Sequence, residues 1–318
     1  MRIDWLPPEL PQLATLLDPA EMERIISARS RISALRLERI RYRPQRNCLI
    51  TWSASVESVD GPHRTFLSIL ACRNGESGRH LEQTAALNTA KMTRAAALPE
   101  LDAVLWIFPQ DRKLRGIAAL DDPTALLADL AVEIEGIAPQ KSLDVVHFVA
   151  ERACTARVKL RDEAGWAYGK FYRPGESARS WELMNRLWMS ESCQSGQLII
   201  PAPLAHHPAT ASVWLQGLVG EPLDQGATDG QLFETGRRLA SLHATPREGL
   251  LEITGTELAA QLRRAIETIL LVRPDLRERL AALSRSLGTI GMGSPGTLHG
   301  DLHLKNIFGL GDGRIALI

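Results

Sequence analysis

The feature that most constrains the fold is a change of hydrophobic periodicity near residue 222. Before it, four segments alternate apolar and polar side chains, and the first of them is long enough for two strands. A helical face marked by Trp181, Met184 and Trp188 follows the second segment. The sequence therefore predicts five short strands with one helix after the third. The four alternating segments are residues 144–160, 165–173, 198–207 and 212–220.

The chain after residue 222 is predicted to be mainly helical. Thr228, with Gln231 three residues later, is a capping-box pattern that begins a helix. Leucine and isoleucine at helical spacing predict two further helices, over 258–270 and 276–287, with Pro274 between them.

Residues 1–140 precede these blocks and predict an additional α+β domain. Residues 1–35 are helical and turn-rich, and 36–72 contain two strands. Residues 104–120 then predict a strand and a turn, and a helix follows.

The chain also resembles itself when it is shifted by about 106 residues. Residues 40–50 then lie on 146–156, so that Cys48 meets Cys154, and with one gap Phe66 falls at the place of Lys170. One hypothesis is that residues 36–120 are a second, degenerate small lobe without the lysine. The alternative is that two unrelated hairpins share a common pattern.

The composition excludes several partners. The chain has 318 residues, of which 37 are Lys or Arg and 37 are Asp or Glu, so its net charge is zero. We therefore expect neither a nucleic-acid partner nor an anionic membrane surface. Four cysteines without a CxxC pair and the lack of a signal-peptide pattern predict a cytoplasmic protein with reduced thiols. No feature of the sequence fixes an oligomeric state.

The segment 297–318, TLHGDLHLKNIFGLGDGRIALI, carries the chemistry. Gly300 allows a tight loop that presents Asp301 as a candidate general base. Asn306 offers a neutral amide oxygen, which suits a hard Mg²⁺ ion that also binds water and phosphate. Asp312-Gly313 then predicts a hairpin turn between two apolar runs.

The pattern His299-Gly300-Asp301-x4-Asn306 resembles the catalytic loop of the aminoglycoside phosphotransferase and choline kinase-like family. The resemblance covers residues 144–318 and implies a protein-kinase-like two-lobe fold. An antiparallel five-stranded small lobe would occupy 141–221, and a mainly helical large lobe, incomplete at its C-terminus, would occupy 222–318. The extra α+β domain at 1–140 would precede them.

The resemblance implies a nucleotide site with three parts. Lys170 would hold the α- and β-phosphates of ATP or GTP, and Glu182 on the next helix would pair with it. Glu176 and Glu191 compete with Glu182 for this role. The stretch from Gln216 to Leu218 would offer backbone hydrogen bonds to the base.

In the catalytic loop, the resemblance makes Asp301 the base and Asn306 a magnesium ligand, and it places His303 near the transferred phosphate. The chain departs from the family in its Leu304-Lys305 pair, where Pro-Gly is usual, and in its lack of a glycine-rich lid between the first two strands. The family also places an Asp after the strand that ends here at Ile318. We therefore expect the chain to be a fragment of a longer protein, or a natural truncation that binds without catalysing.

The favoured expectation is a phosphotransferase that moves the terminal phosphate of ATP or GTP, with Mg²⁺, to a hydroxyl of a small molecule. Sugars, amino alcohols and aminoglycosides are the acceptors that the resemblance implies. The alternative is a pseudokinase, a regulatory nucleotide-binding module without turnover. A protein kinase is less favoured, because Gly300 stands where those enzymes usually carry Arg.

Overall fold

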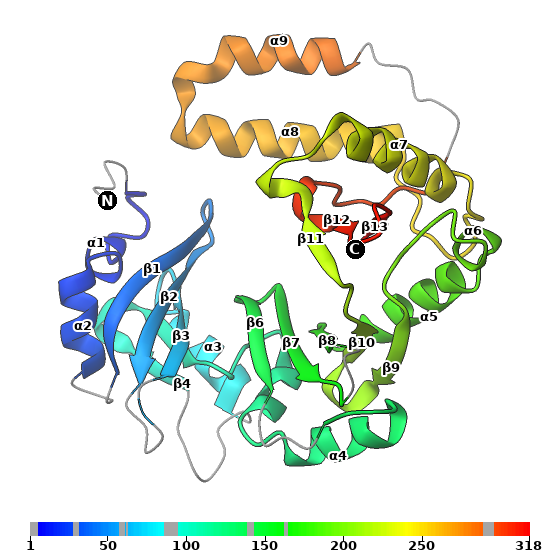
Figure 1. Ribbon diagram of the computed structural model, residues 1–318. Helices are drawn as coiled ribbons and strands as arrows, with labels where there is room; N and C mark the ends of the chain where they lie inside the picture. The colour runs from blue at the N-terminus through cyan, green and yellow to red at the C-terminus, as the bar shows by residue number, and fades with distance from the viewer. Residues whose placement is uncertain are drawn as a thin grey trace. The chain divides into compact units, whose positions relative to one another are not determined.

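The computed structural model describes residues 6–27, 32–56, 61, 63–85, 95–138, 143–161, 165–288 and 296–318. The chain divides into two compact units. The described residues form two five-stranded sheets and one three-stranded sheet (Figure 1). The first unit comprises Met1–Pro123, His147–Cys154 and Phe171–Pro174, and the second comprises Thr124–Val146, Thr155–Lys170 and Gly175–Ile318. The turn at 149–153 therefore belongs to the same compact unit as the N-terminal segment.

The sheet of the first unit has the order β1-β2-β3-β5-β4, and every neighbouring pair is antiparallel. Its core lies between β2, β3 and the two N-terminal helices, where Ile50, Trp52 and Ile69 pack in one cluster with Leu13 and Met22. Burying each of these side chains contributes about 1.5–3 kcal/mol. The elements are α1 (Leu13–Leu16), α2 (Pro19–Ser27), β1 (Ile32–Arg43), β2 (Asn47–Val56), β3 (His63–Ala71), α3 (Ser77–Ala85), β4 (Ala95–Leu98) and β5 (Ala103–Ile107).

The second sheet has the order β6-β7-β8-β10-β9. A close approach of β8 to β10 depends on Gly169, because a Cβ built there would lie 2.5 Å from the ring of the buried Trp214. The elements of this region are α4 (Thr124–Glu133), β6 (Asp144–Val149), β7 (Ala153–Lys159), β8 (Trp166–Phe171), α5 (Ser177–Trp188), α6 (Glu191–Gln194), β9 (Pro203–His207) and β10 (Ser212–Gln216).

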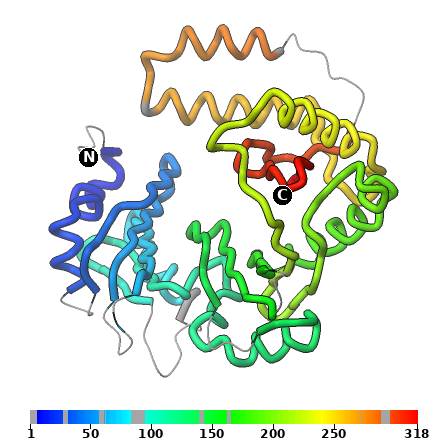
Figure 2. Tube along the Cα trace, in the orientation of Figure 1, coloured from blue at the N-terminus to red at the C-terminus, as the bar shows by residue number. Residues whose placement is uncertain are grey.

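The C-terminal part combines a three-stranded sheet, β11-β12-β13, with three helices. The hairpin of β12 and β13 lies beside α7 (Figure 2). Leu242 of that helix shares a core cluster with Ile307 and Ile315. The predicted capping box is present, since Thr228 and Gln231 exchange hydrogen bonds at the start of α7. The elements are β11 (Gly220–Pro222), α7 (Asp229–His243), α8 (Gly255–Val272), α9 (Arg277–Gly288), β12 (Ile307–Leu310) and β13 (Ile315–Leu317).

The predicted α+β fold, with an antiparallel sheet lobe before a helical part, is confirmed. Two predicted strands differ in extent. The segment 198–207 is extended as a strand only from Pro203, because Pro201 has no N–H with which to join a ladder. The segment 212–220 divides at Gly217, so that its end forms β11 in a different sheet.

The two five-stranded sheets repeat one design. Their strand orders correspond one to one, and a helix follows the third strand in both. Residues other than glycine with a left-handed backbone also recur at corresponding loops. Gln45 (φ 55°) and Glu151 (φ 61°) lie in the first turn of each sheet, and Asp102 (φ 38°) and Ala211 (φ 50°) lie in the last. Such conformations are uncommon outside glycine, so their recurrence adds to the shared strand order.

Candidate functional site

The loop that carries Asp301 is held by a ring of hydrogen bonds. His299 donates from Nε2 to the carbonyl of Ile318 (2.8 Å), and the N–H of Ile318 donates to the carbonyl of Asn306 (3.0 Å). Asn306 in turn donates from Nδ2 to the carbonyl of Asp301 (2.9 Å). Gly300 makes the turn possible with φ of 83°. The structure therefore brings Asp301 and Asn306 together and fixes both against the end of β13.

The side chains of this loop differ in their exposure to solvent. Asp301 and His303 are exposed, whereas Asn306 is half-buried. Because the amide nitrogen of Asn306 bonds to Asp301, its amide oxygen is directed away from that bond and can meet a cation. His303 precedes a short 3₁₀ turn at Leu304–Asn306, and its carbonyl accepts from the N–H of Asn306 (2.8 Å).

The side chain of Asn306 carries one neutral amide oxygen of the kind that can bind a divalent cation. Among the described residues, no group of three or more His, Cys, Asp or Glu side chains could hold a metal ion. Mg²⁺ commonly binds few protein ligands and completes its shell with water and nucleotide phosphates. An amide oxygen at Asn306 is compatible with that mode of binding.

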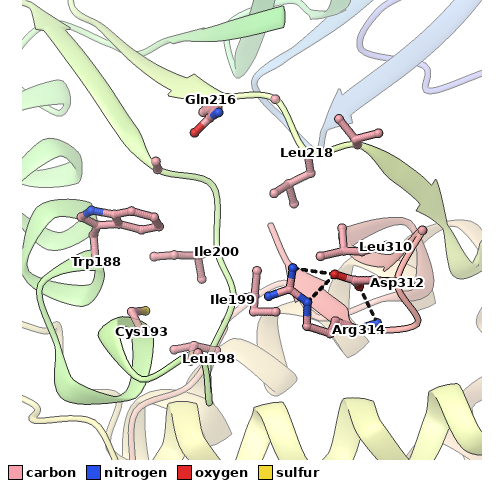
Figure 3. Close-up of a pocket in the computed structure, with 15 residues that line it drawn as sticks. Trp188, Cys193, Leu198, Ile199, Ile200, Gln216, Leu218, Leu310, Asp312 and Arg314 are labelled. Carbon is pink, nitrogen blue, oxygen red and sulfur yellow. Dashed lines mark hydrogen bonds and ion pairs between the residues drawn. The ribbon is translucent and has the colours of Figure 1, made fainter. Parts of the chain in front are cut away.

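A cavity of about 540 Å³ lies at the other end of the β12–β13 hairpin. This size is typical of small-molecule pockets. Gln216 and Leu218 line it, as does the turn from Leu310 to Arg314, and Trp188 and Ile200 contribute apolar walls (Figure 3).

Gly217, between Gln216 and Leu218, is required by the local packing. Its N–H donates to the carbonyl of Trp166 (2.7 Å), and a Cβ there would lie 2.6 Å from the same oxygen. The stretch predicted to face a nucleotide base thus runs past β8 and along the cavity.

The turn beside the cavity is ordered by Asp312 and Arg314. The backbone N–H of Arg314 donates to Oδ1 of Asp312 (3.0 Å), and its Nε donates to Oδ2 (2.6 Å), as Figure 3 shows. These hydrogen bonds, with the charge of Arg314, lower the pKa of Asp312. The pair keeps the predicted Asp-Gly turn closed.

Lys170 and Glu182 lie on the elements that were predicted for them. Lys170 is exposed on β8, between the buried residues Gly169 and Phe171, so it points to the sheet face opposite theirs. Glu182 is exposed on α5. The described residues that line the cavity include neither of them, nor Asp301, His303 or Asn306.

The structure thus forms two groups of predicted residues, the loop at 299–306 and the cavity beside 216–218, at opposite ends of β12. Sequence reasoning did not identify Trp188, Ile199, Ile200 or Arg314 as lining residues. Trp188 was predicted only as part of the apolar face of a helix, Ile199 and Ile200 have no distinctive spacing, and Arg314 was marked only through its turn.

Within the described ranges, every helix is too short or too polar to cross a lipid bilayer. Comparison with curated proteins gave no match. Among solved structures, the chain is similar to one described as the streptomycin-ATP-APH(2″)-IIa ternary complex. The identity is 14%, the match covers 60% of this chain and 68% of that chain, and the TM-score is 0.42.

The comparison with protein families is more specific. Residues 149–318, more than half of the chain, match a family described as the phosphotransferase enzyme family. The matched segment contains the lysine strand, the cavity and the Asp301 loop. The chain therefore belongs to the phosphotransferase enzyme family.

Proposed function

We propose that the protein transfers the terminal phosphate of ATP or GTP to a hydroxyl group of a small molecule, with Mg²⁺. Sugars, amino alcohols and aminoglycosides are the candidate acceptors. The observation that carries the proposal is the hydrogen-bonded loop that joins His299, Asp301, Asn306 and Ile318, because it presents one carboxylate and one amide oxygen from a fixed backbone. Phosphoryl transfer requires mainly such positioning and charge stabilisation.

In this proposal the base of the nucleotide occupies the cavity beside Gln216 and Leu218. Lys170 binds the α- and β-phosphates, and Glu182 orients Lys170. Asn306 holds the magnesium ion, which would neutralise phosphate charge. Asp301 orients the acceptor hydroxyl and accepts its proton at a carboxylate oxygen, while His303 lies near the transferred group.

The role of Asp301 can be tested in the purified protein. We expect Asp301→Ala to lower kcat by roughly 10²–10⁴-fold, the range for loss of a general base, and to leave the Kd for Mg-ATP unchanged. Asp275→Ala is a matched control, because Asp275 is also an exposed carboxylate but lies outside the Asp301 loop, where it pairs with Arg273. Turnover that survives in Asp301→Ala would reject this assignment.

The role of Lys170 has a different readout. Lys170→Ala should weaken nucleotide binding, since an ammonium group on the phosphates is lost. Lys159→Ala, on the neighbouring strand β7, serves as the control. Calorimetric titration with Mg-ATP measures both variants, and equal dissociation constants for Lys170→Ala and the wild type would count against the assignment.

The alternative function, nucleotide binding without turnover, predicts a distinct result. A bound nucleotide at 100 times its Kd stabilises a protein by about 2.7 kcal/mol, which a thermal-shift assay detects. Stabilisation by Mg-ATP, with no phosphate released and no acceptor phosphorylated, would favour the regulatory module.

We also propose that residues 1–140 form an N-terminal domain derived from a second copy of the small lobe at 141–221, with 222–318 as the large lobe. Arg73, Gly75, Glu76 and Ser77 recur as Arg173, Gly175, Glu176 and Ser177. If Arg73 is aligned with Arg173, then Leu70 on β3, rather than Phe66, is the position equivalent to Lys170 on β8. Leu70 is 1% exposed, so this copy has no ammonium group at the equivalent place.

The proposed location is the reducing cytoplasm. All four cysteines are free thiols, and three are buried. Burial raises the pKa of both Cys48 and Cys72 to about 12. Thiols of this kind remain protonated and unreactive.

A further inference from the structure

A buried carboxylate lies at the turn between β6 and β7, in the first unit. The side chain of Glu151 is 3% exposed, and its backbone has φ of 61°. Glutamate is rarely buried to this extent unless it is paired, and a left-handed backbone adds strain. Both features therefore require compensating contacts.

Cations supply the first set of contacts. Arg112 donates to Oε1 of Glu151 through Nε (2.8 Å) and Nη2 (2.6 Å), and Arg41 donates to Oε2 (2.6 Å). Lys113 and Arg43 approach Oε2 at 3.2 Å and 3.8 Å. Burial alone would raise the pKa of Glu151, but the charges and hydrogen bonds of Arg112 and Lys113 outweigh it and hold that pKa below its usual value.

The backbone of Glu151 is fastened as well. Its N–H donates to Oδ2 of Asp111 (2.7 Å), a buried carboxylate that also accepts from the N–H groups of Lys113 and Leu114. Its carbonyl accepts from Arg173, through Nη2 at 3.0 Å and Nε at 3.3 Å. Arg173 follows Lys170 by three residues in the sequence. One residue thus joins the β6–β7 turn to segments 41–43 and 111–113 and to the end of β8.

The corresponding turn of the first sheet, at Gln45, has similar backbone contacts but no buried charge. There the N–H of Gln45 donates to the carboxylate of Glu9 (3.3 Å), and its carbonyl accepts from Arg73 (2.5 Å). The backbone contacts therefore repeat, but the side chain of Gln45 is exposed, whereas that of Glu151 is buried among cations. Because the first sheet keeps the backbone contacts without a buried charge at Gln45, the buried carboxylate of Glu151 is an added feature of the second sheet.

We infer that Glu151 is a positioning residue for nucleotide binding, which it promotes by clamping the β6–β7 turn to segments 41–43 and 111–113 and, through Arg173, to the strand end after Lys170. This inference rests on the proposed nucleotide site. In protein kinases a glycine-rich loop covers the nucleotide phosphates. Here the turn between the first two strands lacks those glycines and is clamped instead. If this turn and the strand that carries Lys170 are already ordered before the nucleotide binds, the entropy cost of nucleotide binding is lower.

The test compares the Kd of Mg-ATP in the wild type and three variants, by calorimetric titration. Glu151→Gln removes the charge, and Arg112→Gln removes the contacts to Oε1 but leaves Arg41 and Lys113 to pair with the carboxylate. Gln45→Ala is the matched control in the first copy. We expect Glu151→Gln to raise Kd roughly 5- to 150-fold, the range of coupling between linked sites, and Arg112→Gln to raise it in the same direction. Gln45→Ala should leave Kd unchanged.

A purely structural role would give another pattern. Glu151→Gln would then unfold at lower denaturant concentration but bind Mg-ATP with the wild-type Kd, and that result would overturn the inference. If Glu151→Gln does not fold, Arg112→Gln decides, since an unchanged Kd in that variant has the same meaning. Failure of the wild type itself to bind Mg-ATP would reject the proposed nucleotide site, and the two failures are thereby distinguished.

Discussion

A substitution at Gly169 tests how closely β8, the strand that carries Lys170, packs against Trp214. A Cβ at this position would lie 2.5–2.6 Å from three carbons of the Trp214 ring, and real Cβ contacts essentially never fall below 3.0 Å. The ring cannot yield easily, because Trp214 is 0% exposed and its Nε1 donates to the hydroxyl of Ser212 (3.0 Å). Gly169→Ala must therefore displace β8, including the backbone of Lys170.

The expected magnitude follows from two opposing effects. Forcing an extra carbon into a packed core costs about 1–3 kcal/mol. Replacing glycine by alanine restricts the unfolded chain, which stabilises by about 0.4–1 kcal/mol. We therefore expect the free energy of unfolding to fall by about 1.3 kcal/mol, the difference between the midpoints of these two ranges.

The same chemical change elsewhere should have the opposite sign. Gly236 lies in the exposed middle of α7, where a Cβ would meet no atom within 4 Å. Gly236→Ala should stabilise by about 1 kcal/mol through helix propensity. Urea unfolding followed by circular dichroism measures both variants. Equal stabilisation of Gly169→Ala and Gly236→Ala would refute the contact between β8 and Trp214.

Two further predictions concern a helix cap and acid stability. Thr228→Ala should lower the free energy of unfolding by about 0.5–2 kcal/mol, since the N–H of Gln231 loses its cap; an unchanged urea midpoint would contradict this. The pKa of Glu151 is lowered in the folded state, so its contribution is complete above the ordinary value of 4.5 and is lost as pH falls through the folded value. In Glu151→Gln the free energy of unfolding should therefore fall less steeply as the pH is lowered below 4.5 than in the wild type. An equally steep fall would contradict the ion pairing of Glu151.

Local patterns were sufficient to predict most elements of the fold. The helical face of Trp181 and Met184 became α5, and the Thr228 capping box begins α7 as expected. Alternating residues located the strands of the second sheet and most of those of the first, because side chains of a strand point to opposite faces in turn. Strand β4 was not predicted, since its sequence, Ala-Ala-Ala-Leu, does not alternate. The Asp-Gly turn joins β12 and β13 as predicted.

Long-range contacts were beyond such patterns. Glu151 pairs with Arg41 and Arg112, which are 110 and 39 residues away in the sequence. In the sequence, Glu151 appeared only as part of a turn without glycine. The repeated Arg-x-Gly-Glu-Ser segments at 73–77 and 173–177 carried usable information, since they show the register in which the two copies correspond.

Under the proposed duplication, the two sheets differ at two positions to which a role in nucleotide binding is proposed. Leu70 is buried in the first copy at the place where Lys170 is exposed in the second, so only the second can present an ammonium group. Gln45 and Glu151 share their backbone contacts, but only Glu151 carries a charge. All four cations around that charge come from the N-terminal segment, two of them from β1. In the proposed duplication, the first sheet has no lysine at the place of Lys170, and its strand β1 and the loop after β5 instead supply the charges that pair with Glu151 at the β6–β7 turn.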